Sequence, residues 1–180
     1  MKKGTRIKKA PLNKRVFAYI VDWYFCWVFC ALPVCWLWNV VTKKTAINTD
    51  ITLFPKPYGI VAGLLGILFG IIYYYVVPLK MGGQTLGKKF LSLKIVDKNG
   101  VVLSAANLAK RQILGVMILE SSFMITGDYV ARIISMFTFD IVGKVINYVM
   151  LVTFLVSCYM LFKKGTTIHD NFGHSMVVEK

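Results

Sequence analysis

The residues with the clearest chemical potential lie at the start of the first long apolar segment. Arg15 and Asp22 are seven residues apart, and Tyr19 lies between them. In a helix this spacing puts all three on one face, with a rise of roughly 10 Å between the two charges, which is too long for a direct ion pair. A carboxylate at this depth therefore needs a partner on another helix or a role in binding.

Two roles for Asp22 fit the sequence. In the first, the buried carboxylate exchanges a proton for a cation, which couples the two movements. In the second, Asp22 is a structural clamp that accepts hydrogen bonds from polar side chains of neighbouring helices. Both roles predict that Asp22 points into the helix bundle.

Glu120, which is followed by Ser121 and Ser122, is the second candidate intramembrane acid, and we expect it nearer the external side.

The composition indicates an integral membrane protein, because 57% of the 180 residues are hydrophobic and only 17% are charged. Three windows have the apolar length that a spanning helix needs: 16–38, 58–79 and 145–162. A fourth helix reaches spanning length if it begins near Ser104, which is a favourable N-cap, and continues to Thr126. We expect residues 128–143 to form an external interfacial or re-entrant helix.

The second window carries a stripe of glycines. Gly59, Gly63, Gly66 and Gly70 are spaced by four, three and four residues, so they share one helix face. Such a face lets another helix backbone approach closely in lipid. We expect it to pack against a helix of the same chain, and a dimer interface is the competing interpretation.

The net charge of +14 is unevenly distributed along the chain. Residues 1–15 and 80–111 each contain seven basic residues, whereas 39–57 and 127–144 contain few. The positive-inside rule therefore places the first two segments in the cytoplasm and the other two outside. We expect a multi-pass protein of the bacterial inner membrane with both termini cytoplasmic. The basic residues then face anionic lipid headgroups, and no nucleic-acid partner is expected.

Residues 82–103 have a different character and predict a cytoplasmic hairpin insert. A β-branched segment, 91–96, leads to Asn99-Gly100, which favours a tight turn, and 101–103 supplies the returning strand. Because an isolated hairpin is only marginally stable, we expect 175–178 to add a third strand.

These elements together predict an all-α membrane protein, a four-helix transmembrane bundle with a small cytoplasmic β-hairpin or three-stranded cap. The predicted parts are a basic cytoplasmic tail, the bundle with its insert, and a cytoplasmic tail that joins the cap: 1–15, 16–162 and 163–180.

The sequence contains no motif typical of an enzyme, so we expect neither catalysis nor a cofactor. The four cysteines lie in apolar segments without paired spacing, which indicates buried thiols. His169 and His174 lack the further ligands of a metal site, so none is expected.

Several of these features together resemble the RDD family of small prokaryotic membrane proteins. Arg15 and Asp22 match the arginine and aspartate of its first helix, and we match Asp170 to its second aspartate. The segments that resemble the family's other blocks are G83-Q84-T85-L86-G87-K88-K89, L93-K94-I95-V96-D97-K98-N99-G100, I168-H169-D170 and V177-V178. The resemblance covers about residues 14–178.

The resemblance implies transport of an unidentified ligand, with cation/proton antiport in some members. On this basis the predicted function is transport-related, with cation/proton exchange through an intramembrane carboxylate. The alternative is a non-transporting regulatory or assembly partner of another membrane protein. Four helices make a thin wall for a transport path, so we expect a homo-oligomer or a membrane-protein partner. Arg15, Asp22, Asp170 and Glu120 are the candidate functional residues.

Overall fold

The computed structural model describes residues 8–180, so the first seven residues of the predicted basic tail lie outside the described part. In chain order the elements are α1 (Leu12–Thr42), η1 (Ile51–Leu53), α2 (Lys56–Ile71), η2 (Ile72–Val76), α3 (Val77–Lys80), α4 (Leu86–Phe90), β1 (Leu93–Asp97), α5 (Ala105–Ala109), η3 (Lys110–Leu119), α6 (Ile125–Phe137), α7 (Asp140–Lys164), α8 (Ile168–Phe172) and β2 (Ser175–Glu179). The segments η2 and η3 are π-helical.

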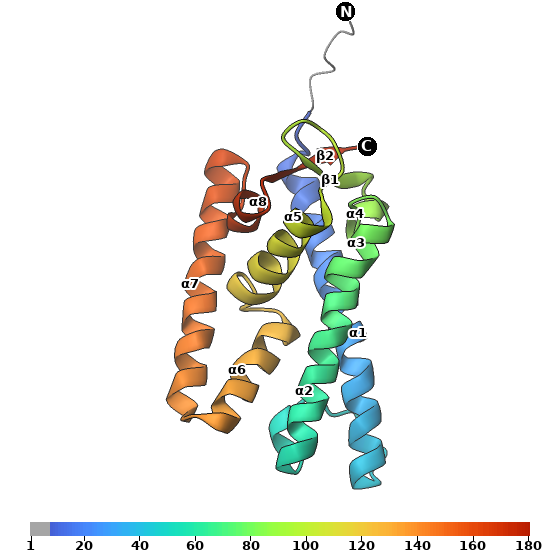
Figure 1. The fold of residues 1–180 in the computed structure, drawn as a ribbon, viewed down its shortest axis with the longest axis vertical. Helices are drawn as coiled ribbons and strands as arrows, with labels where there is room; N and C mark the ends of the chain where they lie inside the picture. Colours follow the sequence, from blue (N-terminus) through green and yellow to red (C-terminus); the bar gives the residue numbers. More distant parts are fainter. Residues whose placement is uncertain (1–7) are drawn as a thin grey trace, which may run out of the picture.

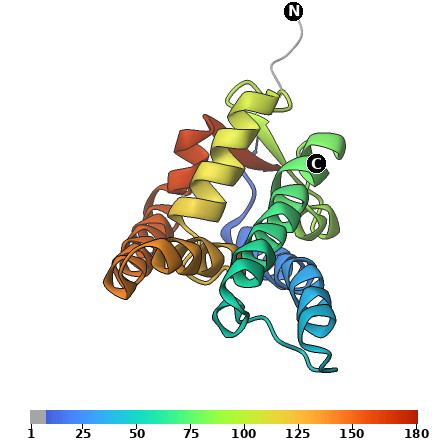
Figure 2. The same ribbon diagram turned by 60° about the horizontal axis from the view of Figure 1, so that its bottom comes forward.

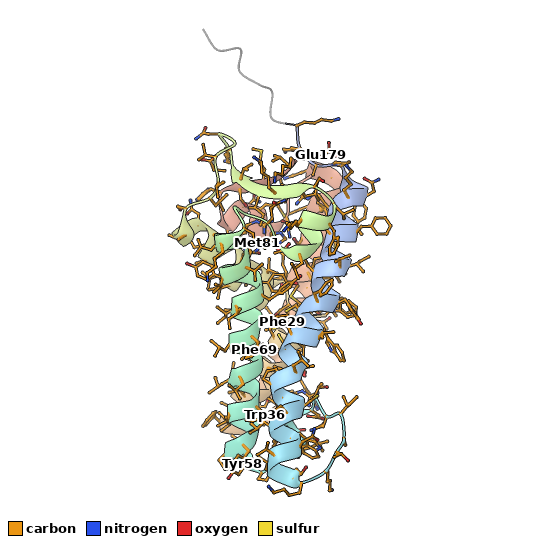
Figure 3. The ribbon with its side chains drawn as sticks, turned by 90° about the vertical axis from the view of Figure 1, so that its right-hand side faces the viewer. Phe29, Trp36, Tyr58, Phe69, Met81 and Glu179 are labelled. Atoms are coloured by element: carbon orange, nitrogen blue, oxygen red, sulfur yellow. The ribbon has the colours of Figure 1, made fainter. Side chains whose placement is uncertain are left out.

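Three long helical segments form the frame of the molecule (Figure 1). They are α1, the continuous run from α2 to α3, and α7, and each is long and apolar enough to cross a membrane. They contain the three predicted windows and extend beyond them. Figure 3 shows α1 and α2 packed along each other, with Phe29 and Phe69 near the middle and Trp36 and Tyr58 toward one end. The prediction of a multi-pass membrane protein is therefore supported.

The fourth predicted helix is interrupted, which corrects the expectation of a continuous helix from Ser104 to Thr126. Ser104 caps α5 as expected, because its side chain accepts a hydrogen bond from the Asn107 N–H. The helix ends at Leu119, residues 120–124 are not helical, and α6 then continues to the other end of the bundle (Figure 1). The bundle thus combines three long helices with one segment made of two short halves.

The glycine stripe explains why α6 belongs to the bundle. Gly63 faces Ile133, Gly66 faces Tyr129 and Gly70 faces Thr126. A Cβ atom at Gly66 would lie 2.3 Å from the Tyr129 ring, so only glycine permits this approach. Packing within the chain is therefore confirmed. The expectation that 128–143 forms one external interfacial or re-entrant helix is wrong, because α6 ends at Phe137 and packs inside the bundle, and α7 already begins at Asp140.

The small sheet is two-stranded rather than three-stranded. β1 and β2 pair antiparallel, with Ile95 opposite Val177, so the predicted tail strand is confirmed. The predicted strand 101–103 is reduced to a single bridge between Val96 and Val102, because the N-cap at Ser104 ends it before a ladder forms. On its other edge, β2 forms one bridge with Lys9.

The sheet, α4 and α8 lie together at one end of the bundle, which is called the cap end below (Figures 1 and 2). The chain starts α1 at this end and finishes there with β2, and Figure 3 shows Met81 and Glu179 on the same side. The cap end therefore gathers both ends of the described chain and the basic connection between α3 and α5.

Candidate functional site

Asp22 is buried inside the bundle, as predicted, and both carboxylate oxygens are fully engaged. Oδ1 accepts hydrogen bonds from the Tyr73 hydroxyl at 2.8 Å and from the Gly87 N–H at 2.8 Å. Oδ2 accepts from the Thr85 hydroxyl at 2.5 Å and from Lys88 Nζ at 3.0 Å. Four donors from two other segments therefore hold one carboxylate.

The loop 82–88 is shaped to receive this carboxylate. A Cβ atom at Gly87 would lie 2.4 Å from the Ala18 carbonyl oxygen and 2.9 Å from Asp22 Oδ1, so glycine is required for the contact. Burial lowers the pKa of Lys88 from its ordinary value, and the Asp22 charge opposes that shift. The family-like block Thr85-x-Gly87-Lys88 and the aspartate of the first helix are thus one site. Nothing in their sequence spacing shows that they meet.

A second ionic cluster surrounds Asp170 in α8. Arg15 Nη2 contacts Asp170 Oδ2 at 2.5 Å, and Arg15 Nη1 donates to the Gly165 carbonyl oxygen at 2.7 Å. Arg111 Nη2 contacts Asp170 Oδ1 at 2.7 Å. Asp170 also closes a capping box with Thr167 at the start of α8. The carboxylate therefore joins α1, η3 and the C-terminal segment.

Arg111 is the principal residue that the sequence did not reveal. It is 1% exposed, and its guanidinium also donates to Ser175 Oγ at 3.0 Å and to Gln112 Oε1 at 3.2 Å. The pair Lys110-Arg111 looked like a topology determinant, and the sequence does not say which of the two is buried. A Cβ atom at Gly173 would lie 2.6 Å from Arg111 Cβ, so this glycine makes room for the arginine.

The charges around Asp170 set its protonation state. Burial alone would raise the pKa of this carboxyl, but the charges of Arg111, His169 and Arg15 together lower it below its ordinary value of 3.8. A carboxyl with a lowered folded-state pKa stabilises the fold above its unfolded pKa and loses that contribution as the pH falls. The cluster is therefore ionised at neutral pH and weakens only in strong acid.

Glu120 is paired with His169, and its position corrects the expectation that it lies toward the external side. Glu120 Oε1 accepts the His169 backbone N–H at 2.8 Å, and Oε2 lies 2.8 Å from His169 Nδ1. The segment 105–119 starts at the cap end and covers only about 22 Å even as a regular helix, less than the bilayer core of about 30 Å. Glu120 therefore reaches α8 at the cap end.

His169 lies between two carboxylates. Its Nδ1 faces Glu120, and its Nε2 is 3.7 Å from Asp170 Oδ1. Gly115 permits this arrangement, because a Cβ atom there would lie 2.5 Å from His169 Cβ. Three of the four predicted residues, Arg15, Asp170 and Glu120, thus belong to one connected cluster, while Asp22 lies in the neighbouring one.

A cavity of about 240 Å³ adjoins both clusters between α1, α7 and the cap. Arg15, Lys88, Arg111, Glu120 and His169 supply its polar lining. The apolar lining comes mainly from α1 and α7: Val16, Ala18, Tyr19, Phe154, Cys158, Leu161 and Phe162. The Glu120–His169 pair is therefore a titratable pair that faces open space, whereas Asp22 and Asp170 lie behind their cationic partners.

Asp22→Asn tests whether this carboxylate is a structural clamp, because Tyr73, Gly87 and Lys88 all donate and an amide would place N–H groups against donors. We expect Asp22→Asn to lower the free energy of unfolding by about 3–5 kcal/mol, since it leaves Lys88 buried without its partner. Adding Lys88→Met should restore part of the loss. Asp128→Asn, which breaks a pair that is about 40% exposed, is the matched control and should cost less than about 1 kcal/mol. The free energy of unfolding is measured in mixed micelles for the unmodified protein, the two single variants and the double variant. Equal losses of stability in Asp22→Asn and Asp128→Asn would contradict the clamp.

Arg111→Lys keeps the charge, but a single ammonium lacks the planar fork with which Arg111 reaches Ser175, Gln112 and Asp170 at the same time. We expect it to lower the free energy of unfolding by about 2–3 kcal/mol, because buried acceptors lose their donors. The adjacent exposed Lys110→Arg is the control and should change stability by less than about 0.5 kcal/mol. The same unfolding measurement tests this prediction. If Arg111→Lys leaves the free energy of unfolding unchanged, the charge alone is enough to hold Asp170.

Comparison with known proteins agrees with this geometry. No curated protein and no solved structure matches the chain. The sequence profile of the RDD family matches residues 9–174, which include Arg15, Asp22, the 83–89 block and Asp170. The match spans nearly the whole chain, so this protein belongs to the RDD family.

Proposed function

We propose that the protein is transport-related and exchanges a cation for a proton at the Glu120–His169 pair. The observation that carries the proposal is the interruption of a bundle segment at 120–124, with Glu120 at the break and facing a cavity. Membrane transporters commonly bind substrates and coupling ions where a membrane helix is discontinuous. No catalytic role is proposed.

The occupancy of each carboxylate argues for Glu120 over Asp22 and Asp170. A carboxylate that binds a cation needs free lone pairs, and four donors already fill those of Asp22. Asp170 is neutralised by two arginines. The Glu120 side chain instead faces a histidine, the residue type whose charge changes near neutral pH. A cation bound at Glu120 would repel the proton on His169 and displace it. One positive charge would then leave the site as another arrives.

Access from the opposite end of the bundle has its own structural support. A second cavity, of about 570 Å³, lies there and is lined by Asp128 and Arg132 of α6 and by Asp140, Lys144 and Asn147 of α7. The two halves of the interrupted segment each border one cavity. On the face of α6 that packs against α2, the buried hydroxyls of Thr126 and Tyr129 have no hydrogen-bond partner among the described residues. Polar groups of this kind can be used along a path that opens transiently.

The proposal is tested in proteoliposomes that contain a pH-sensitive dye. A Na⁺ or K⁺ gradient is imposed across the membrane, and the change in internal pH is measured. We expect the unmodified protein to move protons in the direction opposite to the cation. Glu120→Gln should abolish the exchange, because a neutral amide lacks the negative charge that attracts the cation. Glu179→Gln is the matched control, because it makes the same chemical change in an exposed pair with Lys14. Exchange that persists in Glu120→Gln, or that is absent from the unmodified protein, would refute the proposal.

A second candidate function is a non-transporting partner of another membrane protein. One observation favours it: only 11% of the most apolar window of α7 is buried, against 33% for α2. The free face of α7 offers room for a second copy or for a helix of another protein. This candidate gains support if exchange is absent while the protein purifies as a stable oligomer or complex.

The orientation that we propose places the cap end in the cytoplasm of a bacterial cell. Its support is the gathering of both basic segments, 8–15 and 80–111, at that end. Reporter fusions inserted at Asn48 and at Asn99 should give external and cytoplasmic signals, respectively. Matching signals at the two positions would overturn the orientation.

A further inference from the structure

The cavity near Glu120 opens between two helices that barely touch. Figures 1 and 2 show α7 apart from α1, with α8 and the α5–η3 segment beside them. The rings of Tyr19 and Phe154, 6.2 Å apart, close the cavity toward the middle of the bundle. At the cap end its wall ends at Val16 and Phe162, which are 37% and 69% exposed.

This opening faces lipid rather than water. Val16 lies in α1 and Phe162 in α7, both within segments able to span a membrane. Lys163 and Lys164 in the last turn of α7 mark the level of the headgroups, and Lys163 lies over the Tyr159 ring at 5.2 Å. The cavity therefore extends from headgroup level into the region of the first acyl carbons.

The lining combines a charged end with apolar walls. Arg15, Lys88 and Arg111 are at the polar end, where they pair with Asp170 and Asp22. Lys164, two residues after the lining residue Phe162, forms no salt bridge within residues 8–180. Lys88 Nζ has two acceptors, Asp22 and Thr85, for three N–H groups, so one donor is free. An anionic group at the rim and a hydrocarbon chain between α1 and α7 would satisfy both parts.

We propose that this cavity binds one anionic phospholipid from the leaflet on the cap side. Its headgroup lies near Arg15 and Lys164, and one acyl chain begins between Val16 and Phe162 and runs toward Tyr19 and Phe154. The volume of about 240 Å³ is below the roughly 300–1,000 Å³ of pockets for whole small molecules, which fits one end of a chain whose remainder stays in the bilayer. The bound lipid separates the Glu120–His169 pair from the surrounding hydrocarbon, and its binding does not depend on the exchange proposed above.

Native mass spectrometry of protein taken from nanodiscs of phosphatidylglycerol, phosphatidylcholine or a mixture tests this site. We expect one retained phosphatidylglycerol in the unmodified protein. Cys158→Trp fills the apolar wall of the cavity and should remove that lipid. Leu155→Trp adds the same side chain to α7 at an exposed position outside the cavity lining, and should leave the lipid in place.

The charge of the site is tested separately with Lys164→Gln. It should reduce retention of phosphatidylglycerol by about fivefold and leave retention of phosphatidylcholine unchanged, because it removes one cation beside the headgroup. Lys163→Gln is the matched control and should change neither, since Lys163 lies over the Tyr159 ring outside the cavity lining. Equal lipid loss from Cys158→Trp and Leu155→Trp, the absence of any preference for phosphatidylglycerol, or retention of a free fatty acid in its place would each overturn the proposal.

If Cys158→Trp does not fold, alkylation of Cys158 supplies the same answer. In a Cys35→Ser background the two remaining cysteines, Cys26 and Cys30, are buried. A lipid-soluble maleimide should then modify Cys158 more slowly in phosphatidylglycerol nanodiscs than in phosphatidylcholine nanodiscs. Equal rates would show that no anionic lipid occupies the cavity.

Discussion

The Asp170 carboxylate between Arg15 and Arg111 is the interaction on which the architecture of the cap end depends. Its three members come from the start of α1, the start of η3 and the C-terminal segment, and all three are nearly inaccessible to solvent. Charges removed from water in this way are stable only in pairs with their hydrogen bonds satisfied. Loss of any one member therefore leaves a buried charge without its partner. The C-terminal segment is consequently held in the bundle, where α8 presents His169 to Glu120 and β2 pairs with β1.

The Asp22 cluster applies the same constraint to a different pair of segments. It fastens the loop before β1 to the first helix, as Asp170 fastens the segment before β2. Arg15, Lys88 and Arg111 balance Asp22, Asp170 and Glu120, so the two clusters together are neutral when His169 is neutral. His169 lies between Glu120 and Asp170 and so links these two carboxylates within the network.

The features that could be predicted from the sequence are those set by local pattern. The three apolar windows, the glycine stripe and the tail strand follow from length, spacing and β-branched residues. The inward orientation of Asp22 and its distance from Arg15 follow from the cost of burying charge and the rise of a helix. The burial of Arg111 could not be predicted, because it depends on α8 folding back over η3. The position of Glu120 could not be predicted either. Neither half of the interrupted segment, 105–119 or 125–137, has the length that identifies a spanning helix.

The interruption itself has a physical origin in the packing on its two sides. Gly115 lets α8 approach η3 so closely that the His169 backbone N–H reaches Glu120, which ties the first half to the cap end. Gly63, Gly66 and Gly70 let α6 approach α2, which ties the second half to the other end of the bundle. A straight helix would have to give up one of these two contacts. The short non-helical segment 120–124 allows both, and it leaves an acidic side chain beside a cavity instead of inside a closed helix interface.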